Sequence, residues 1–118
     1  MDLVVRVYRL GRTLPDSEKY GLRAQMQRAA VSIPANIAEG HGRTHLLDKL
    51  RFFSVANGSL KELETEVKIA ARLGLVPSAE ARTFVVQSEE CCRMLGSLMR
   101  SLRRRAGLPA NRQPPTVN

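Results

Sequence analysis

The sequence predicts an all-α protein, an antiparallel up-down-up-down four-helix bundle. Apolar residues recur at intervals of three and four along four stretches of the 118-residue chain, which is the period of one helix face. Short Pro- or Gly-containing segments separate the stretches, and short connections favour antiparallel neighbours. Only five residues are aromatic and none is Trp, so an aliphatic core of closely packed helices is expected. We expect the bundle over residues 1–108 and a flexible tail over residues 109–118.

The first predicted helix covers residues 2–13. Its apolar residues form one stripe: Leu3, Val4, Val7, Leu10 and Leu14. Three basic residues recur every third position on another face: Arg6, Arg9 and Arg12. Pro15 ends the helix, because the residue before a proline is displaced from the helical region of backbone angles.

The second predicted helix covers residues 17–40 and contains Pro34. This proline removes one amide hydrogen bond and presses on the carbonyl of Ala30, so we expect a kink. The alternative is a break, followed by a new start capped by Ser32. The glycine-rich run at residues 40–42 ends the segment in both cases.

The third and fourth predicted helices cover residues 44–73 and 78–105. Thr44 and Ser78 are the residues expected to cap their first turns. Gly74 supplies a left-handed stop between the two helices. With these four helices, the sequence accounts for a complete bundle.

The charge of the chain points to an anionic partner. The net charge is +8, yet residues 100–112 alone carry five Arg and no acid, which leaves +3 for the rest. Arginine binds phosphate through a planar fork of donors, so RNA or DNA is a possible partner, and an acidic protein is another. No aromatic residue interleaves these arginines, which favours binding by shape and charge without sequence specificity. The candidate nucleic-acid-binding residues are Arg6, Arg9, Arg12, Arg23, Arg28, Arg100, Arg103, Arg104 and Arg105.

No residue pattern indicates an enzyme, a metal site or a cofactor. Glu62, Glu64 and Glu66 resemble a carboxylate cluster, but no second convergent group is identifiable. His41 and His45 are interpreted as exposed loop histidines, since glycines interrupt the helix between them. We therefore predict no catalytic residues, no metal and no cofactor.

The sequence is typical of a cytoplasmic protein without membrane contact. Cys91 and Cys92 are adjacent and cannot build a disulfide framework, so two buried, reduced thiols are expected. The chain opens with no signal sequence, and no apolar run approaches the roughly 18 residues of a membrane span.

One stretch carries a specific resemblance to a known family. Residues 20–40 contain the run Ser-Ile-Pro-Ala-Asn-Ile-Ala-Glu-Gly, and further matching positions are Arg43, Phe52, Gly58-Ser59-Leu60, Glu62-Leu63-Glu64-Thr65 and Leu73-Gly74-Leu75. Together they resemble the signature of the four helix bundle protein family, also called the 23S rRNA intervening-sequence or S23-type family. The resemblance covers roughly residues 3–76 closely and the fourth helix only by pattern.

The resemblance implies a left-handed four-helix bundle that assembles as a ring, typically a homopentamer, without catalytic activity. Family members resemble the accessory protein of diversity-generating retroelements, a basic pentamer that binds nucleic acid and a reverse transcriptase. Others are encoded within sequences that interrupt 23S rRNA genes. The implied function is a non-enzymatic scaffold that binds nucleic acid. The alternative is a protein-binding or purely structural homo-oligomer.

The signature residues are expected to be mainly architectural, with a ligand site as the alternative. They are Ser32, Pro34, Asn36, Glu39, Gly40, Arg43, Gly58, Glu62 and Glu64. Asn36 and Glu39 need polar partners if they are buried, and Arg43, Ser59 and Asn57 are candidates. Gly58 costs about 1 kcal/mol inside a helix, which a close helix–helix approach would explain. Glu64 is expected to pair with an Arg of a neighbouring helix.

The chain departs from the family pattern at its beginning. Family members usually start about ten residues earlier, whereas Met1 here falls inside the first helix. Either the first helix is truncated or the start site is misassigned. A truncated helix would leave one end of the third helix less covered.

Overall fold

The computed structural model describes residues 2–15, 17 and 21–109. These residues form four α-helices and no strand: α1 (Asp2–Arg12), α2 (Leu22–Gly42), α3 (Leu46–Arg72) and α4 (Ser78–Arg105). The predicted all-α, four-helix fold class is confirmed. Within the described residues, no helix is both long and apolar enough to cross a membrane. The predicted flexible tail falls, except for Pro109, outside this part of the chain.

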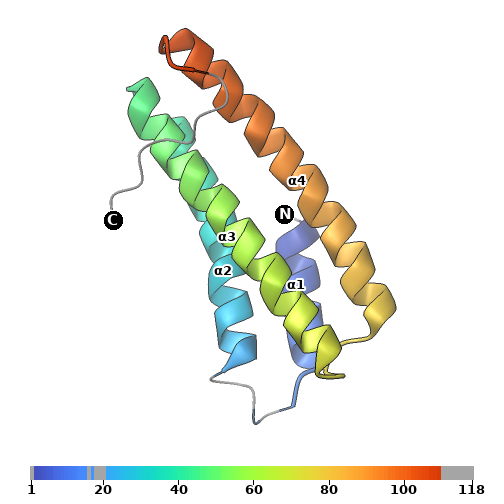
Figure 1. Cartoon of the computed structure of the whole chain (residues 1–118). Coiled ribbons are helices and arrows are strands. Elements are labelled where there is room, and N and C mark those ends of the chain that lie inside the picture. The colour runs from blue at the N-terminus through green and yellow to red at the C-terminus, as the bar shows by residue number, and fades with distance from the viewer. Residues whose placement is uncertain (1, 16, 18–20, 110–118) are drawn as a thin grey trace.

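Successive helices run in opposite directions along the molecule (Figure 1). The contact between α2 and α3 is the most extensive, followed by that between α3 and α4, while α1 and α4 make the smallest contact. At about 1.5 Å per residue, α1 is roughly 16 Å long and α4 roughly 42 Å. The short α1 therefore lies beside only part of α4 (Figure 1).

One aliphatic core runs between the four helices. The predicted stripe of α1 is buried, and in α2 small alanines on the buried face bring the backbone close to α3. The buried residues of α1 and α2 are Leu3, Val7, Leu10, Met26, Ala29, Ala30 and Ile33, with Leu14 just after α1. Those of α3 and α4 include Leu50, Phe53, Leu60, Leu63, Val67, Phe84, Leu95 and Leu102.

Glycines in the left-handed backbone conformation end α3 and α4. Gly74 has φ of 74°, and the amide of Leu75 donates to the carbonyl of Ala70 at 2.9 Å. Gly107 has the same φ, and Leu108 donates back to the carbonyl of Arg103 at 2.8 Å. A side chain would be strained at this φ, so glycine at these two positions defines where α3 and α4 stop.

The observed helix starts differ from the predicted ones. His45 and Pro77 occupy the N-cap positions of α3 and α4 in extended conformations, and neither makes a side-chain cap bond. Thr44 therefore lies one residue too early to cap α3, and Ser78 already lies inside the first turn of α4. The described part of the second helix begins at Leu22. The expected caps are wrong because the extended residue before each helix is not the one with the short polar side chain.

α2 is continuous through Pro34 and extends to Gly42. The alternative of a break restarted at Ser32 is thus wrong, while the kink stays a prediction. Because Gly40 and Gly42 are helical, His41 also belongs to the last turn of α2 and not to a loop.

Candidate nucleic-acid interface

Gly40 lets the aromatic ring of Phe53 lie directly on the backbone of α2. A Cβ at Gly40 would be only 2.5 Å from Cε1 of this ring, a distance that real Cβ atoms essentially never show. His41 packs its ring edge-on against Phe53, with 5.2 Å between ring centroids. The glycine that ends the family signature is therefore a packing residue inside the helix, and not a helix stop.

Side chains of the α2–α3 corner satisfy the last carbonyls of α2. The Lys49 Nζ donates to the carbonyls of Gly40 at 3.2 Å and His41 at 3.1 Å. A cation at a helix C-terminus also complements the helix dipole. Arg43 pairs with Glu39 at 3.1 Å and lies 4.7 Å from the ring centroid of Phe52. Glu39 thus meets one of its expected partners, in an exposed pair.

A chain of hydrogen bonds crosses from α2 to α3 in the middle of the hairpin. The hydroxyls of Ser32 and Ser59 are 2.8 Å apart. The Nδ2 of Asn36 donates to both the hydroxyl and the carbonyl of Ser32, at 3.0 and 2.7 Å. Asn57 lies outside this chain, and its Oδ1 is buried without a hydrogen-bond partner. The signature residues of the hairpin therefore bind one another.

Two signature residues of α3 behave differently from the expectation. Glu64 accepts a hydrogen bond from the hydroxyl of Ser88 at 3.0 Å and pairs with Lys68 at 3.2 Å, in place of an Arg. Gly58 is exposed, and a Cβ added there would meet nothing within 4 Å. Among the described residues, no close helix approach accounts for this glycine. Glu62 is also exposed.

Glu66 is the one member of the glutamate cluster that is buried, with 6% of its surface exposed. Burial raises the pKa of its carboxyl to about 7; the neighbouring Glu62 adds to this rise, and Arg28 opposes it. Its Oε1 has no hydrogen-bond partner. A signal was present in the sequence, because Glu66 follows Leu63 by three positions and precedes Ala70 by four, on the edge of the core-facing stripe.

The candidate arginines differ in how far their side chains are exposed. Arg103 is only 7% exposed, because it follows the buried Met99 by one helical turn, so its place on a binding surface was wrongly predicted. Arg23 is half-buried, and its Nη2 donates to the carbonyl of Leu14 at 2.7 Å, which fixes the connection after α1. Arg28 is exposed on α2 and lies within electrostatic range of Glu66.

Two sets of arginines remain on the surface. We call Arg6, Arg9 and Arg12 the α1 arginines; the first is half-buried and the other two are exposed. We call Arg100, Arg104 and Arg105 the α4 arginines, all of which are exposed. None of the six enters an ion pair within the described residues.

The two sets lie at different ends of the molecule. The hydroxyl of Thr13, just after α1, donates to the carbonyl of Leu75 in the α3–α4 turn at 3.5 Å. From this turn α4 extends roughly 42 Å to its arginine-rich end (Figure 1). The separation follows from the up-down-up-down order, because α4 runs opposite to α1 and carries its arginines at its C-terminal end (Figure 1).

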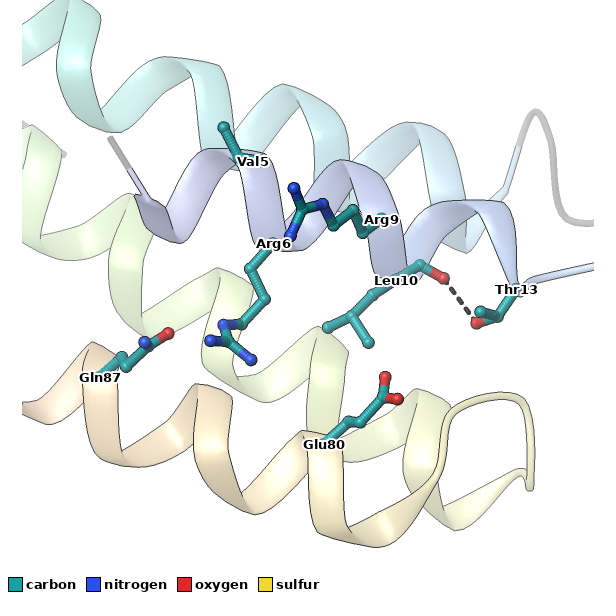
Figure 2. Close-up of a pocket in the computed structure, with 7 residues that line it drawn as sticks. All are labelled: Val5, Arg6, Arg9, Leu10, Thr13, Glu80 and Gln87. Carbon is teal, nitrogen blue, oxygen red and sulfur yellow. Dashed lines mark hydrogen bonds between the residues drawn. The ribbon is translucent and has the colours of Figure 1, made fainter.

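A pocket of about 520 Å³ lies between α1 and α4. We call it the α1–α4 pocket; it is lined by Val5, Arg6, Arg9, Leu10, Glu80 and Gln87. Figure 2 shows the Arg6 side chain reaching from α1 toward α4, between Gln87 and Glu80. The Nε of Arg6 and the Oε1 of Gln87 are both buried and without a hydrogen-bond partner. The sequence had marked Arg6 and Arg9, but not the residues of α4 that face them.

Other residues offer little chemistry. Cys91 and Cys92 are free and half-buried, so they are less enclosed than expected. Burial and the nearby Glu64 raise the pKa of the Cys92 thiol, which disfavours the reactive thiolate. In the described part of the chain, no group of three or more His, Cys, Asp or Glu could hold a metal ion.

Comparison with known proteins gives one family. The family model of the 23S rRNA-intervening sequence protein matches residues 1–97. No curated protein matches the chain. The matched region includes the α1 arginines and the α1–α4 pocket, whereas the α4 arginines lie beyond it.

Proposed function

The chain belongs to the 23S rRNA-intervening sequence protein family, and we propose that it is a non-enzymatic, oligomeric helical scaffold that binds nucleic acid through its arginines without sequence specificity. One observation carries the proposal. The α1 and α4 arginines are presented at the surface, and none is neutralised by an ion pair within the described residues. Unpaired guanidinium groups favour polyanions, because each phosphate contact releases condensed counterions.

The separation of the two sets argues for an assembly. A single chain has three α1 arginines and three α4 arginines, so each set can make only a few phosphate contacts. In a closed ring, which the family resemblance implies, each set is repeated around the axis and several phosphates are met at once. Binding then gains avidity without any base-specific contact.

The outer face of α3 supports a subunit contact. Val55 is 47% exposed and Ile69 is 46% exposed, and Gly58 lies on the same side of the helix with open space above it. The missing side chain at Gly58 allows another helix to approach this face closely, and the exposed Arg51 and Glu62 lie on the same side. Gly58 would then serve a contact between chains, which explains a mid-helix glycine that no contact in the described part of the chain requires.

Nucleic-acid binding is tested by fluorescence anisotropy with a structured RNA and a duplex DNA at 50 and 200 mM salt. We expect affinity to fall steeply over this range for both. The double variant Arg104→Gln/Arg105→Gln should weaken both complexes and reduce the salt slope. Arg82→Gln, an exposed arginine near the start of α4 that belongs to neither set and is not on the outer face of α3, is the control. A flat salt dependence, or equal affinity for all three proteins, would contradict the proposal.

The assembly is tested by light scattering at micromolar concentration. We expect an oligomer for the parent protein and a monomer for Gly58→Arg, whose side chain projects from the outer face of α3. Gly42→Arg is the control, because Gly42 also has open space around it but lies at the end of α2. A monomeric parent protein would rule out the ring.

A second groove favours the alternative, a protein-binding role. It lies between α3 and α4, has a volume of about 470 Å³ and is floored by Ala71, Val85 and Val86. Lys68, Arg72 and Arg82 rim this apolar floor, which suits an amphipathic acidic segment of another protein. Binding of an acidic helical peptide that is lost in Val86→Glu, together with no retention of RNA or DNA at low salt, would favour this function over the first.

A further inference from the structure

Two arginine side chains from α1 line the α1–α4 pocket. Arg6 and Arg9 are three residues apart, so both project from the same side of α1 into the pocket. Figure 2 shows the Arg9 side chain running back along α1 in the direction of Arg6. Neither forms an ion pair within the described residues, although Glu80 lines the same pocket. The pocket thus contains positive charge that no ion pair among the described residues neutralises.

The α4 side of the pocket presents hydrogen-bond acceptors. The Oε1 of Gln87 is buried and has no donor, while the Nε of Arg6 is a buried donor without an acceptor. Arginine donors and the amide of Gln87 therefore line the same pocket, so a ligand there can pair with groups of both kinds. Such a ligand would supply both an acceptor and a donor. Val5 and Leu10 add apolar surface beside the polar groups.

We propose that the α1–α4 pocket binds a single nucleotide, whose phosphate lies between Arg6 and Arg9 and whose base donates an N–H to Gln87. A bare phosphate would satisfy the arginines and leave the acceptor of Gln87 unpaired, whereas a base or sugar carries the required donor. The volume of about 520 Å³ is within the range of small-molecule sites, roughly 300–1,000 Å³. The site deepens the proposed function, on which it rests, because an unpaired nucleotide of a bound strand can occupy it.

The test is titration of the full chain with adenosine monophosphate by isothermal titration calorimetry, with inorganic phosphate and adenosine as partial ligands. We expect the nucleotide to bind at least tenfold more tightly than either part. Arg6→Gln and Gln87→Leu should each lower its affinity at least tenfold. Arg93→Gln, on the same helix as Gln87 but outside the pocket and outside both arginine sets, is the control and should leave the affinity unchanged.

A further variant separates binding from folding. Gln87→Glu places a carboxylate opposite Arg6, so it should form an ion pair, maintain or raise the melting temperature and still abolish nucleotide binding. A nucleotide affinity that is unchanged in Arg6→Gln and Gln87→Leu would overturn the site.

Failure of the site can be told from failure of the proposed function. If a polynucleotide binds in dependence on the α4 arginines while adenosine monophosphate does not bind, the pocket is not a nucleotide site and the proposed function stands. If neither ligand binds at low salt, both are wrong. If the nucleotide binds but a single-stranded oligonucleotide does not compete with it, the site takes free nucleotides only.

Discussion

The α2–α3 hairpin has a chain of hydrogen bonds between side chains, whereas the α1–α4 seam has a pocket. Unpaired buried polar atoms occur in both, at Asn57 and Glu66 in the hairpin and at Arg6 and Gln87 in the seam. In the hairpin, Ser32, Asn36 and Ser59 bond to one another, and Lys49 satisfies carbonyls at the end of α2. In the seam, Arg6 and Gln87 are partly buried and leave polar atoms unpaired around a pocket. The family signature is concentrated in the first region, and the candidate ligand site is in the second.

This difference shows which part of the molecule carries the fold and which part is available for function. Polar groups that satisfy one another rigidify a structure, because each lost partner leaves a desolvated group behind. Polar groups without partners destabilise the chain, so each of them requires an explanation of its own, and a ligand is one such explanation. The predictions below test this division, from the largest expected effect to the smallest.

Gly40→Ala should destabilise the packing of α2 against α3. The added Cβ would lie 2.5 Å from Cε1 of Phe53, so either the ring or the helix must move. Overpacking of this kind typically costs about 1–3 kcal/mol. Chemical denaturation should show this loss of stability. Gly42→Ala is the matched control, because a Cβ there meets nothing within 4 Å; it should be neutral or slightly stabilising. Equal effects of the two variants would contradict the packing role of Gly40.

Ser59→Ala should weaken the polar chain between α2 and α3. It removes the 2.8 Å bond to Ser32, which keeps its bond with Asn36. Because one partner survives, the expected loss is about 1 kcal/mol. A double-mutant cycle with Ser32→Ala measures the coupling directly. A coupling energy near zero would show that the bond across the hairpin adds nothing to stability.

The sequence predicted the helices well but the roles of single residues unevenly. The core stripes follow from a period of 3.6 residues, and the glycines at φ of 74° follow from backbone sterics, so both could be read from local sequence. The expected caps failed, since the helix starts are set by His45 and Pro77. The partner of Glu64 is a serine on α4, which depends on the register of two helices and has no local signal.

The features of the candidate site were also only partly predictable from the sequence. The burial of Arg103 was readable, because Met99 one turn earlier lies on the widened core face of the predicted helix. The α1–α4 pocket was not readable. It exists because Gln87 and Glu80 face Arg6 across two helices that are distant in sequence and make the smallest contact in the bundle. Such a juxtaposition requires the packed structure.

Glu66, like Asn57, is a residue of the hairpin with an unpaired buried oxygen, and its ionisation should give the fold a pH dependence. Its pKa of about 7 lies above the usual value of 4.5, so the folded state holds a proton that the unfolded chain has released in this window. Stability should therefore be lost as the pH rises from about 4.5 to 7. Glu66→Gln should remove most of this decline in melting temperature. Glu62→Gln should shift the decline to lower pH, because Glu62 helps to raise the pKa of Glu66. A melting temperature that rises over this window would contradict the assignment.

Arg6→Met should have the smallest effect on stability. Its result tests most directly whether polar residues of the α1–α4 seam stabilise the fold as those of the α2–α3 hairpin do. Methionine keeps an apolar stem against the bundle and removes a guanidinium whose Nε is buried without a partner. Losing an unpaired buried donor should change stability by less than about 0.5 kcal/mol, or stabilise the chain. Arg23→Met is the matched variant, because Arg23 donates to the carbonyl of Leu14 at 2.7 Å; it should cost about 1–3 kcal/mol. If Arg6→Met is as costly as Arg23→Met, the seam is built for stability as the hairpin is. If Arg6→Met is nearly neutral, Arg6 is free to act on a ligand.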